Sequence, residues 1–290
     1  MHRSDTVMQA AVYAVSALTL GLFLLVLAYM FWEGRLVFQH TSLAAFLSSS
    51  NWQPLTEPGR FGIASMLAGS LYVSLLALIV AFPIGAGCAV FTIFCLSPRI
   101  RSLVLPCIDM IAGIPSVVFG FIGLMVLVSY MESAFHMASG ECIFAGALLL
   151  AFMIIPFIVT NCSESILRLQ QQYSQASLNL GVSKWYMLWH LLLPQAAPAF
   201  LLSIILAFSR AMGETMAVMM VTGNAKVWPT LFGKGETIPA LIALEMGSAE
   251  YDSPHYYALY AAAAALLVLL LLCNLLVYVG ARRMRKEEAK

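Results

Sequence analysis

The sequence predicts an all-α, polytopic membrane protein with six transmembrane helices. Of its 290 residues, 61% are hydrophobic and only 10% are charged, whereas soluble domains average about 45–50% and about 25%. Long runs without Asp, Glu, Lys or Arg divide the chain, and about 20 helical residues suffice to cross about 30 Å of hydrocarbon. The period-2 alternation of a membrane barrel is absent. A water-soluble protein is therefore excluded, and the formal charge of +1 gives no electrostatic basis for binding nucleic acid.

Each expected helix corresponds to one uncharged run. The expected spans lie at about 7–32, 64–96, 103–131, 142–160, 196–222 and 256–281. The first run exceeds the about 7–15 apolar residues of a secretory signal, and no small-residue cleavage site follows Trp32. We therefore expect residues 1–290 to form a single transmembrane domain, without a soluble domain, a tandem repeat or a low-complexity tract.

The distribution of basic residues predicts the orientation of the spans. With the N-terminus in the cytoplasm, ten of the 15 Lys and Arg residues fall in cytoplasmic segments and four fall outside. The remaining one, Arg210, lies within a span. The positive-inside rule therefore predicts that both termini are cytoplasmic.

No pattern in the sequence indicates catalysis or a metal site. The six cysteines lie in or beside apolar runs without CxxC spacing, and the five histidines show no HExxH spacing. Gly233 and Lys234 are similar to part of a phosphate-binding loop, but Trp228 and Gly235 occupy positions that this motif reserves for other residues. Asp109, in the third expected helix, is interpreted as a solvated or capped carboxylate rather than a proton carrier. We therefore expect no enzymatic activity, no metal and no cofactor bound by this chain.

Small residues recur every four positions on two expected helices. They are Ala81, Gly85 and Ala89 in the second, and Ala112, Ser116 and Gly120 in the third. Pro83 and Pro115 lie within these faces and are expected to kink the spans. We interpret the faces, with Gly113 and Pro115 beside the second of them, as sites of close helix packing in lipid. The alternative is that the kinks shape a conduit.

A pair of opposite charges is expected within the fifth span. Arg210 lies about halfway along it, where a lipid-facing charge costs at least about 2.5–3.5 kcal/mol, so the side chain must face protein or water. Glu214 follows four residues later and is expected on the same helix face, together with Ser203, Ala207 and Ala217. Two interpretations remain open: a buried ion pair that neutralises itself, or an anion step in a water-lined path.

The segment 175–194 carries the most specific local pattern. A short polar helix, a glycine that can end it and an aromatic run precede the fifth span. This order resembles the cytoplasmic coupling loop of ATP-binding-cassette importer permeases, whose pattern is Glu-Ala-Ala, three residues, Gly, nine residues, then Ile-x-Leu-Pro. The matching residues are Ala176, Gly181, Leu193 and Pro194, while Gln175, Ser177 and Leu191 replace the acidic residue, the second Ala and the Ile. The resemblance implies a coupling loop at about 161–194 that contacts a separate ATPase; an ordinary amphipathic surface helix is the alternative.

Two further stretches narrow the resemblance. Residues 113–121 read Gly-Ile-Pro-Ser-Val-Val-Phe-Gly-Phe, and residues 209–218 read Ser-Arg-Ala-Met-Gly-Glu-Thr-Met-Ala-Val. Both are similar to signatures of the phosphate-specific transport permeases, and the second favours the C-type subunit. The resemblance implies a type I importer permease fold with a translocation pathway that includes Arg210, Glu214 and Thr215.

The same resemblance implies the assembly around the chain. It comprises a second permease of the A-type, an ATPase dimer that uses ATP and Mg, and an extracytoplasmic phosphate-binding protein, in the lipid of a bacterial inner membrane. Phosphate is the implied substrate. A permease for another oxyanion and an ion-coupled carrier or channel for an anion remain as alternatives.

Overall fold

The computed structural model describes residues 2–288, and side chains within 8–279 apart from that of residue 10. Lys290, one of the basic residues used to predict the orientation, lies outside the described residues. Within them, six helical segments are long and apolar enough to cross a membrane, which confirms the expected number of spans. The five longest helices are α1 (His2–Gly34), α3 (Ala64–Phe94), α7 (Ile143–Asn179), α9 (Leu193–Met212) and α12 (Pro254–Glu288).

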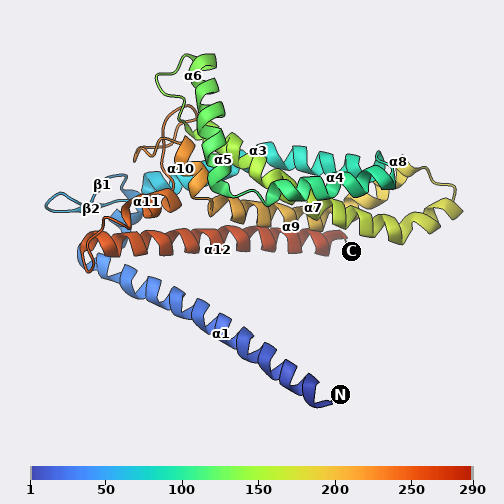
Figure 1. Ribbon diagram of the computed structural model, residues 1–290, viewed down its shortest axis with the longest axis horizontal. Coiled ribbons are helices and arrows are strands. Elements are labelled where there is room, and N and C mark those ends of the chain that lie inside the picture. The colour runs from blue at the N-terminus through green and yellow to red at the C-terminus, as the bar shows by residue number, and fades with distance from the viewer. Residues whose placement is uncertain (1, 289–290) are drawn as a thin grey trace.

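Four of these helices form an elongated bundle. Helices α3, α7, α9 and α12 run along the long axis of the molecule (Figure 1), and α3 packs closely on α7. Small residues permit this approach, because a Cβ added to Gly85 would stand only 2.7 Å from Ile158 Cγ2. Ala81 and Ala89 are fully buried on the same face. The packing expected for the second span is therefore confirmed, and α3 continues unbroken through Pro83.

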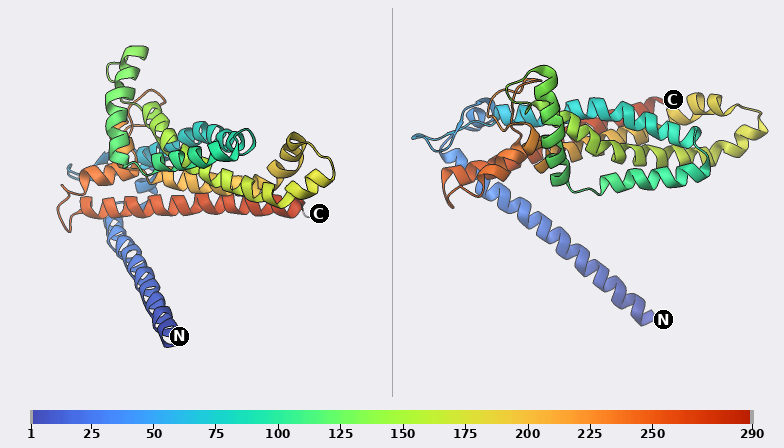
Figure 2. Two further views of the ribbon diagram at one scale, coloured as in Figure 1. Left: turned by 45° about the vertical axis from the view of Figure 1, so that its right-hand side comes forward. Right: turned by 45° about the horizontal axis from the view of Figure 1, so that its top comes forward.

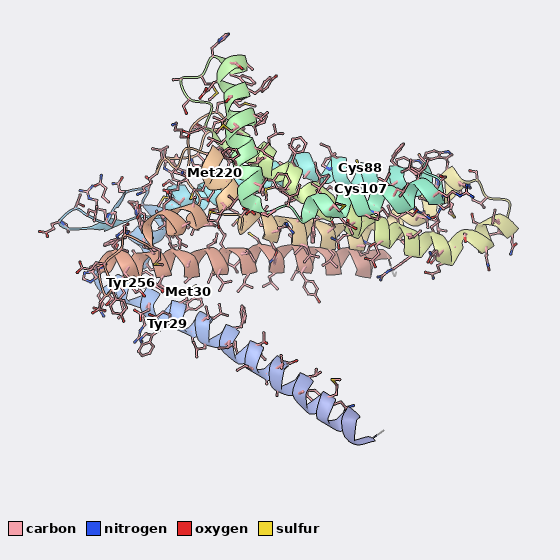
Figure 3. The ribbon with its side chains drawn as sticks, viewed as in Figure 1. Tyr29, Met30, Cys88, Cys107, Met220 and Tyr256 are labelled. Atoms are coloured by element: carbon pink, nitrogen blue, oxygen red, sulfur yellow. The ribbon has the colours of Figure 1, made fainter. Side chains whose placement is uncertain are left out.

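Helix α1 diverges from this bundle. It meets α12 near its own C-terminal end and separates from it toward its N-terminus (Figures 1 and 2). At the junction the Tyr29 ring packs edge-on against Tyr260, with centroids 5.6 Å apart, and the hydroxyls of Tyr29 and Tyr256 lie 3.4 Å apart (Figure 3). Tyrosine is enriched at membrane–water interfaces. Large apolar side chains of α1 away from this junction, such as Leu18, Leu22 and Leu25, are exposed. This surface can contact lipid or another subunit.

Short connections build a second core at this end of the bundle. They are η1 (Arg35–Gln39), α2 (Leu43–Ser48), β1 (Trp52–Gln53), β2 (Arg60–Phe61) and α11 (Ile238–Glu245). The two strands pair antiparallel with Trp52 opposite Phe61, and both rings are buried beside Phe46, Ile63 and Leu259. This end of the protein is therefore a packed structure rather than a set of loose loops.

The prediction of the third helix as a single continuous span is wrong. The chain forms α4 (Pro98–Ala112), breaks at 113–115, and continues as α5 (Ser116–Ile122), a π-helical turn η2 (Gly123–Val128) and α6 (Ser129–Phe135). Pro115 causes the break, because it adopts an extended ψ of 138° and disfavours a helical conformation of the residue before it. The small residues at 112, 116 and 120 therefore do not share one continuous helix face.

The fourth expected helix is longer than predicted. Helix α7 runs on through the polar residues that follow 160 and ends at Asn179. The polar side chains of this stretch form their hydrogen bonds within the helix. Asn161 Nδ2 donates to Phe157 O at 2.7 Å and Ser165 Oγ donates to Asn161 O at 3.0 Å. Arg168 forms an ion pair with Glu164, one turn away. The change in composition therefore marks where apolar surface ends and not where the helix ends.

The fifth expected helix is also interrupted. It begins earlier than predicted, with α8 (Lys184–Met187) and the π-helical turn η3 (Leu188–Leu192) leading into α9, and it breaks at 213–215 before α10 (Met216–Val221). The candidate span therefore covers Lys184–Met212. Two of the expected spans are thus broken within the described residues, at 113–115 and at 213–215, and both breaks contain glycine.

Candidate functional site

Arg210 lies in the last turn of α9, directly before the second break. Its guanidinium carbon stands 6.0 Å from the centroid of the Phe157 ring on α7, a distance at the outer limit of a cation–π contact. The side chain is exposed within this chain, whereas Ser203 and Ala207 are buried. The three residues share one face of the unbroken helix α9, as expected, but burial on that face ends before Arg210 is reached.

The expected pair between Arg210 and Glu214 does not form. Among the described residues no ion pair joins them, and the helical turn that would align them ends at Gly213, whose N–H bonds back to Arg210 O at 3.3 Å. Glu214 instead turns toward α10, where its Oε1 accepts from the backbone N–H of Ala217 at 3.3 Å. A carboxylate is favourable at the start of a helix because free N–H groups point toward it. In place of a buried ion pair, the carboxylate of Glu214 caps α10, and the guanidinium of Arg210 is separate and exposed.

Thr215 completes this break. Its Oγ1 donates to Gly213 O at 3.3 Å, and the residue is half-buried like Glu214. Backbone without regular helical hydrogen bonds is tolerated at membrane depth only where it contacts protein or water. Glu214 and Thr215 therefore lie in the irregular segment between α9 and α10, and Arg210 lies in the last turn of α9 directly before it.

Helices α5 and α10, which follow the two breaks, pack against each other. A Cβ added to Gly120 would stand 2.7 Å from Met220 Sδ and 3.0 Å from Ala217 Cα, and α10 lies beside α5 in Figure 3, where Met220 is labelled. Gly120 is thus a genuine packing residue. Gly113 and Pro115 are exposed and belong to the break, and Ser116, the first residue of α5, is half-buried.

Asp109 has a hydrogen-bond partner on α7 that the sequence did not indicate. Thr160 Oγ1 donates a hydrogen bond to Asp109 Oδ1 at 2.6 Å, which links α4 to α7. Thr160 lies three residues after Phe157 on α7, and Phe157 is the ring under Arg210. The interpretation of Asp109 as merely solvated or capped is therefore incomplete. The available signal was an acidic residue four positions before the Gly113 break, and spacing alone could not identify its partner.

The coupling segment begins as the end of α7. Gln175 to Gly181 was expected to be a separate short helix, which is wrong, because residues up to Asn179 belong to the same 37-residue helix. Gly181 ends it in the left-handed region with φ +66°, and the N–H of Val182 bonds to Ser177 O at 3.0 Å. This is the conformation that glycine adopts most readily after a helix. The predicted role of Gly181 as the stop is confirmed.

The other motif residues surround this turn. Gln175 and Ala176 are exposed, Ser177 is buried, and Leu193 and Pro194 begin α9, where the missing N–H of proline is not needed. Several large apolar side chains at this tip face outward: Leu178, Leu180, Trp185, Tyr186 and Trp189. Beside them lies a cavity of about 330 Å³ lined in part by Tyr173, Ala176 and His190. Exposed apolar surface of this kind is typical of a contact with another protein or with the membrane.

A polar network occupies the opposite end of the bundle. Glu245 accepts from Trp52 Nε1 and His255 Nε2, both at 2.8 Å, and forms an ion pair with Lys226. Burial raises the pKa of Glu245, but the hydrogen bonds from Lys226, Trp52 and His255 outweigh it, and the net effect is a lowered pKa. Glu236 differs, because it is buried and its Oε2 has no hydrogen-bond partner. Burial therefore raises the pKa of Glu236 to about 7, with Lys226 opposing and Glu245 adding to the shift.

Comparison with known proteins identifies the class to which this fold belongs. Residues 81–286 match the model of the family of binding-protein-dependent transport system inner membrane components, and the chain belongs to this family. It is therefore a multi-pass inner membrane protein and a subunit of a transport system.

Individual relatives narrow the comparison. The chain is 33% identical to a probable ABC transporter permease protein, YqgH, of Bacillus subtilis (strain 168), over 82% of this chain and 78% of the relative. It is 32% identical to the phosphate transport system permease protein PstC of Xylella fastidiosa (strain Temecula1 / ATCC 700964), over 76% and 73%. Among solved structures, a chain of a bacterial alginate ABC transporter in complex with an alginate-bound periplasmic protein matches with a TM-score of 0.64 at 17% identity, over 97% of both chains. The resemblance drawn from the motifs is confirmed.

Proposed function

We propose that this chain is the C-type permease subunit of an ATP-driven, binding-protein-dependent importer of inorganic phosphate. Support comes from relatives named as phosphate transport permeases and from the signatures at 113–121 and 209–218. The excess of Lys and Arg at one end of the bundle favours an orientation with both termini in the cytoplasm. The irregular segment at Gly213 then lies in the half of the membrane nearer the outside.

Arg210 provides the anion step of the proposed pathway. Its guanidinium is exposed and forms no ion pair with Glu214, so its donors are available to an oxyanion. Glu214 stays close in sequence with its carboxylate at the start of α10, where it repels a second anion. Transport requires that entry be favourable and that exit not be prevented. An arginine near a carboxylate, with Thr215 beside it, meets both requirements.

Helix α7 connects this step to the partner ATPase, and its continuity is the observation that carries the proposal. The same 37-residue helix contacts Arg210 through Phe157 and ends at the exposed coupling tip near Gln175 and Gly181. Helix α7 stays helical through Pro156, and closely packed interiors transmit displacement from one part of the structure to another. ATP and Mg bound by the ATPase dimer would shift the tip, and α7 would transmit that shift to the pathway.

Exposed surfaces of this chain leave room for the other partners. The large apolar side chains of α4 and α5 that face outward include Leu103, Met110, Val117 and Phe121. We assign this surface to a second permease of the A-type, and the apolar surface of α1 to lipid or that subunit. The connections around β1, β2 and α11 face the side on which an extracytoplasmic phosphate-binding protein would dock.

Transport by the reconstituted complex tests the proposal. The complex, purified with the second permease and the ATPase, is placed in liposomes with phosphate-loaded binding protein, and uptake of radiolabelled phosphate is measured with and without ATP. We expect uptake that requires ATP hydrolysis and is not inhibited by sulfate or a phosphonate. Uptake without ATP would favour an ion-coupled carrier or channel, and equal inhibition by sulfate would favour another oxyanion.

A further inference from the structure

Asp109 carries a charge that the proposed mechanism does not yet use. It lies 11 residues after the start of α4 at Pro98, which places it about 16 Å along that helix. Its carboxylate is exposed, and among the described residues its hydrogen bond comes from Thr160 on α7 and no ion pair neutralises it. Asp109 thus lies on a helix that precedes the third candidate span, and an exposed carboxylate close to a membrane span is expected to face water, another charge or a substrate path.

The side chains of Asp109 and Arg210 both contact the same stretch of α7. Thr160, which binds Asp109, and Phe157, which lies under Arg210, are three residues apart. Residues at that spacing are neighbours on one helix surface, about 4.5 Å apart along the axis. The carboxylate therefore approaches this surface from α4 and the guanidinium from α9. Glu214 caps α10 instead of pairing with Arg210, whereas Asp109 is held at Thr160, one helical turn of α7 from the ring under Arg210.

We propose that Asp109 is a positioning residue for the anion step at Arg210. The hydrogen bond from Thr160 holds the carboxylate of Asp109 on the side of α7 that Arg210 approaches. There the carboxylate lowers the affinity of Arg210 for a bound anion, and it attracts the guanidinium once the anion leaves. This inference rests on the proposed function of Arg210. A negative charge within several ångströms of the binding group lowers anion affinity measurably at the effective dielectric of a protein.

A purely structural role for the same hydrogen bond makes a different prediction. If Asp109 only ties α4 to α7, then Asp109→Asn is harmless, because an amide oxygen still accepts from Thr160. Thr160→Val would be the damaging change, because it removes the donor and keeps the charge. The two accounts therefore assign opposite outcomes to the same pair of variants.

The experiment measures equilibrium binding of radiolabelled phosphate to the purified complex, and the maximal uptake rate of the same complex in liposomes. We expect Asp109→Asn to bind phosphate about tenfold more tightly and to transport more slowly at saturation, since the anion is released late. Asp109→Glu, which restores the carboxylate, should return both values toward those of the wild type, and Thr160→Val, which frees the carboxylate without removing its charge, should tighten binding by less than Asp109→Asn does. Copurification of the ATPase establishes that each complex is intact, and Asp109→Ser replaces Asp109→Asn if the latter does not assemble.

An affinity of Asp109→Asn equal to or weaker than that of the wild type overturns the inference. Tighter binding cannot arise from general damage, so the sign of the change separates the two accounts. Failure of the proposed function is recognised separately, because Arg210→Met would then transport phosphate normally. Loss of uptake in Arg210→Met, together with unchanged binding in Asp109→Asn, refutes the role of Asp109 alone.

Discussion

Ile158 of α7 lies directly over Gly85 of α3, so that a Cβ added to Gly85 would stand 2.7 Å from Ile158 Cγ2. We predict that Gly85→Leu separates the two helices and destabilises the protein by about 1–3 kcal/mol, as overpacking typically does. Thermal unfolding in detergent measures the effect. Gly87, two residues further on the same helix, has no atom within 4 Å of its added Cβ, so Gly87→Leu is the matched control. Equal stability of both variants would refute the packing of this face.

Gly120 makes the corresponding contact between α5 and α10. Its added Cβ would meet Met220 Sδ at 2.7 Å and the backbone of α10 at 3.0 Å, and backbone cannot give way as a flexible side chain can. We predict that Gly120→Leu lowers uptake severely even where the chain reaches the membrane, because α10 carries the Glu214 cap. Gly21→Leu on α1, where nothing lies within 4 Å, is expected to transport normally. Normal uptake by both variants would mean that the α5–α10 contact is dispensable.

Gly181 is required for its backbone conformation and not for space. Its φ is +66° and nothing lies within 4 Å of an added Cβ, so a substitution acts only through the turn. We predict that Gly181→Val and Gly181→Pro abolish phosphate-stimulated ATP hydrolysis, while Gly181→Asn, which tolerates the left-handed region, retains much of it. Gly247→Val is the control, because Gly247 is equally open but lacks a positive φ. Full stimulation in the valine variant would contradict the coupling assignment.

Glu236 gives the stability of the protein a dependence on pH. Its folded-state pKa of about 7 exceeds the ordinary value of 4.5, so the folded protein binds the proton more tightly than the unfolded chain does. Its contribution is therefore complete below about pH 4.5 and is lost as the pH rises to about 7, with a total on the order of 3 kcal/mol. We predict that the melting temperature falls by several degrees between about pH 5 and about pH 8.

The variant Glu236→Gln tests this assignment, because it keeps the shape of the side chain and removes its titration. It should melt at nearly the same temperature at both values of pH. Glu57→Gln, which alters an exposed carboxylate at the same end of the bundle, should keep the wild-type decline. A decline that persists in Glu236→Gln would assign the pH dependence to another group.

The sequence predicted the spans well, because solvation by lipid selects apolar runs wherever the chain folds. It predicted helix continuity poorly. Pro115 gave a visible signal, which was interpreted as a kink where the structure has a break. The break at Gly213 was not predicted because no proline lies there. Glycine by itself is common in unbroken membrane helices and therefore gives no signal. Asn161 and Ser165 caused the opposite error. Their polarity predicted the end of a helix near residue 160, but α7 continues through them.

The candidate site was predicted in composition and not in geometry. Arg210, Glu214 and Thr215 were identified, but the i, i+4 rule that paired the first two applies only within an unbroken helix. Thr160 and Asp109 are 51 residues apart in sequence, and no local periodicity predicts a contact between two separate helices. Such pairs depend on how α4 packs against α7, which hydropathy does not encode.

The central claim is that Arg210 handles the anion in an ATP-driven phosphate importer. The most direct measurement is uptake of radiolabelled phosphate by liposomes that contain intact complexes of wild type, Arg210→Lys or Arg210→Met. We predict that both variants lose at least about tenfold in uptake while the ATPase still copurifies, because lysine keeps the charge but lacks the planar set of donors that matches an oxyanion. Near-normal, ATP-dependent uptake by Arg210→Met would contradict the account.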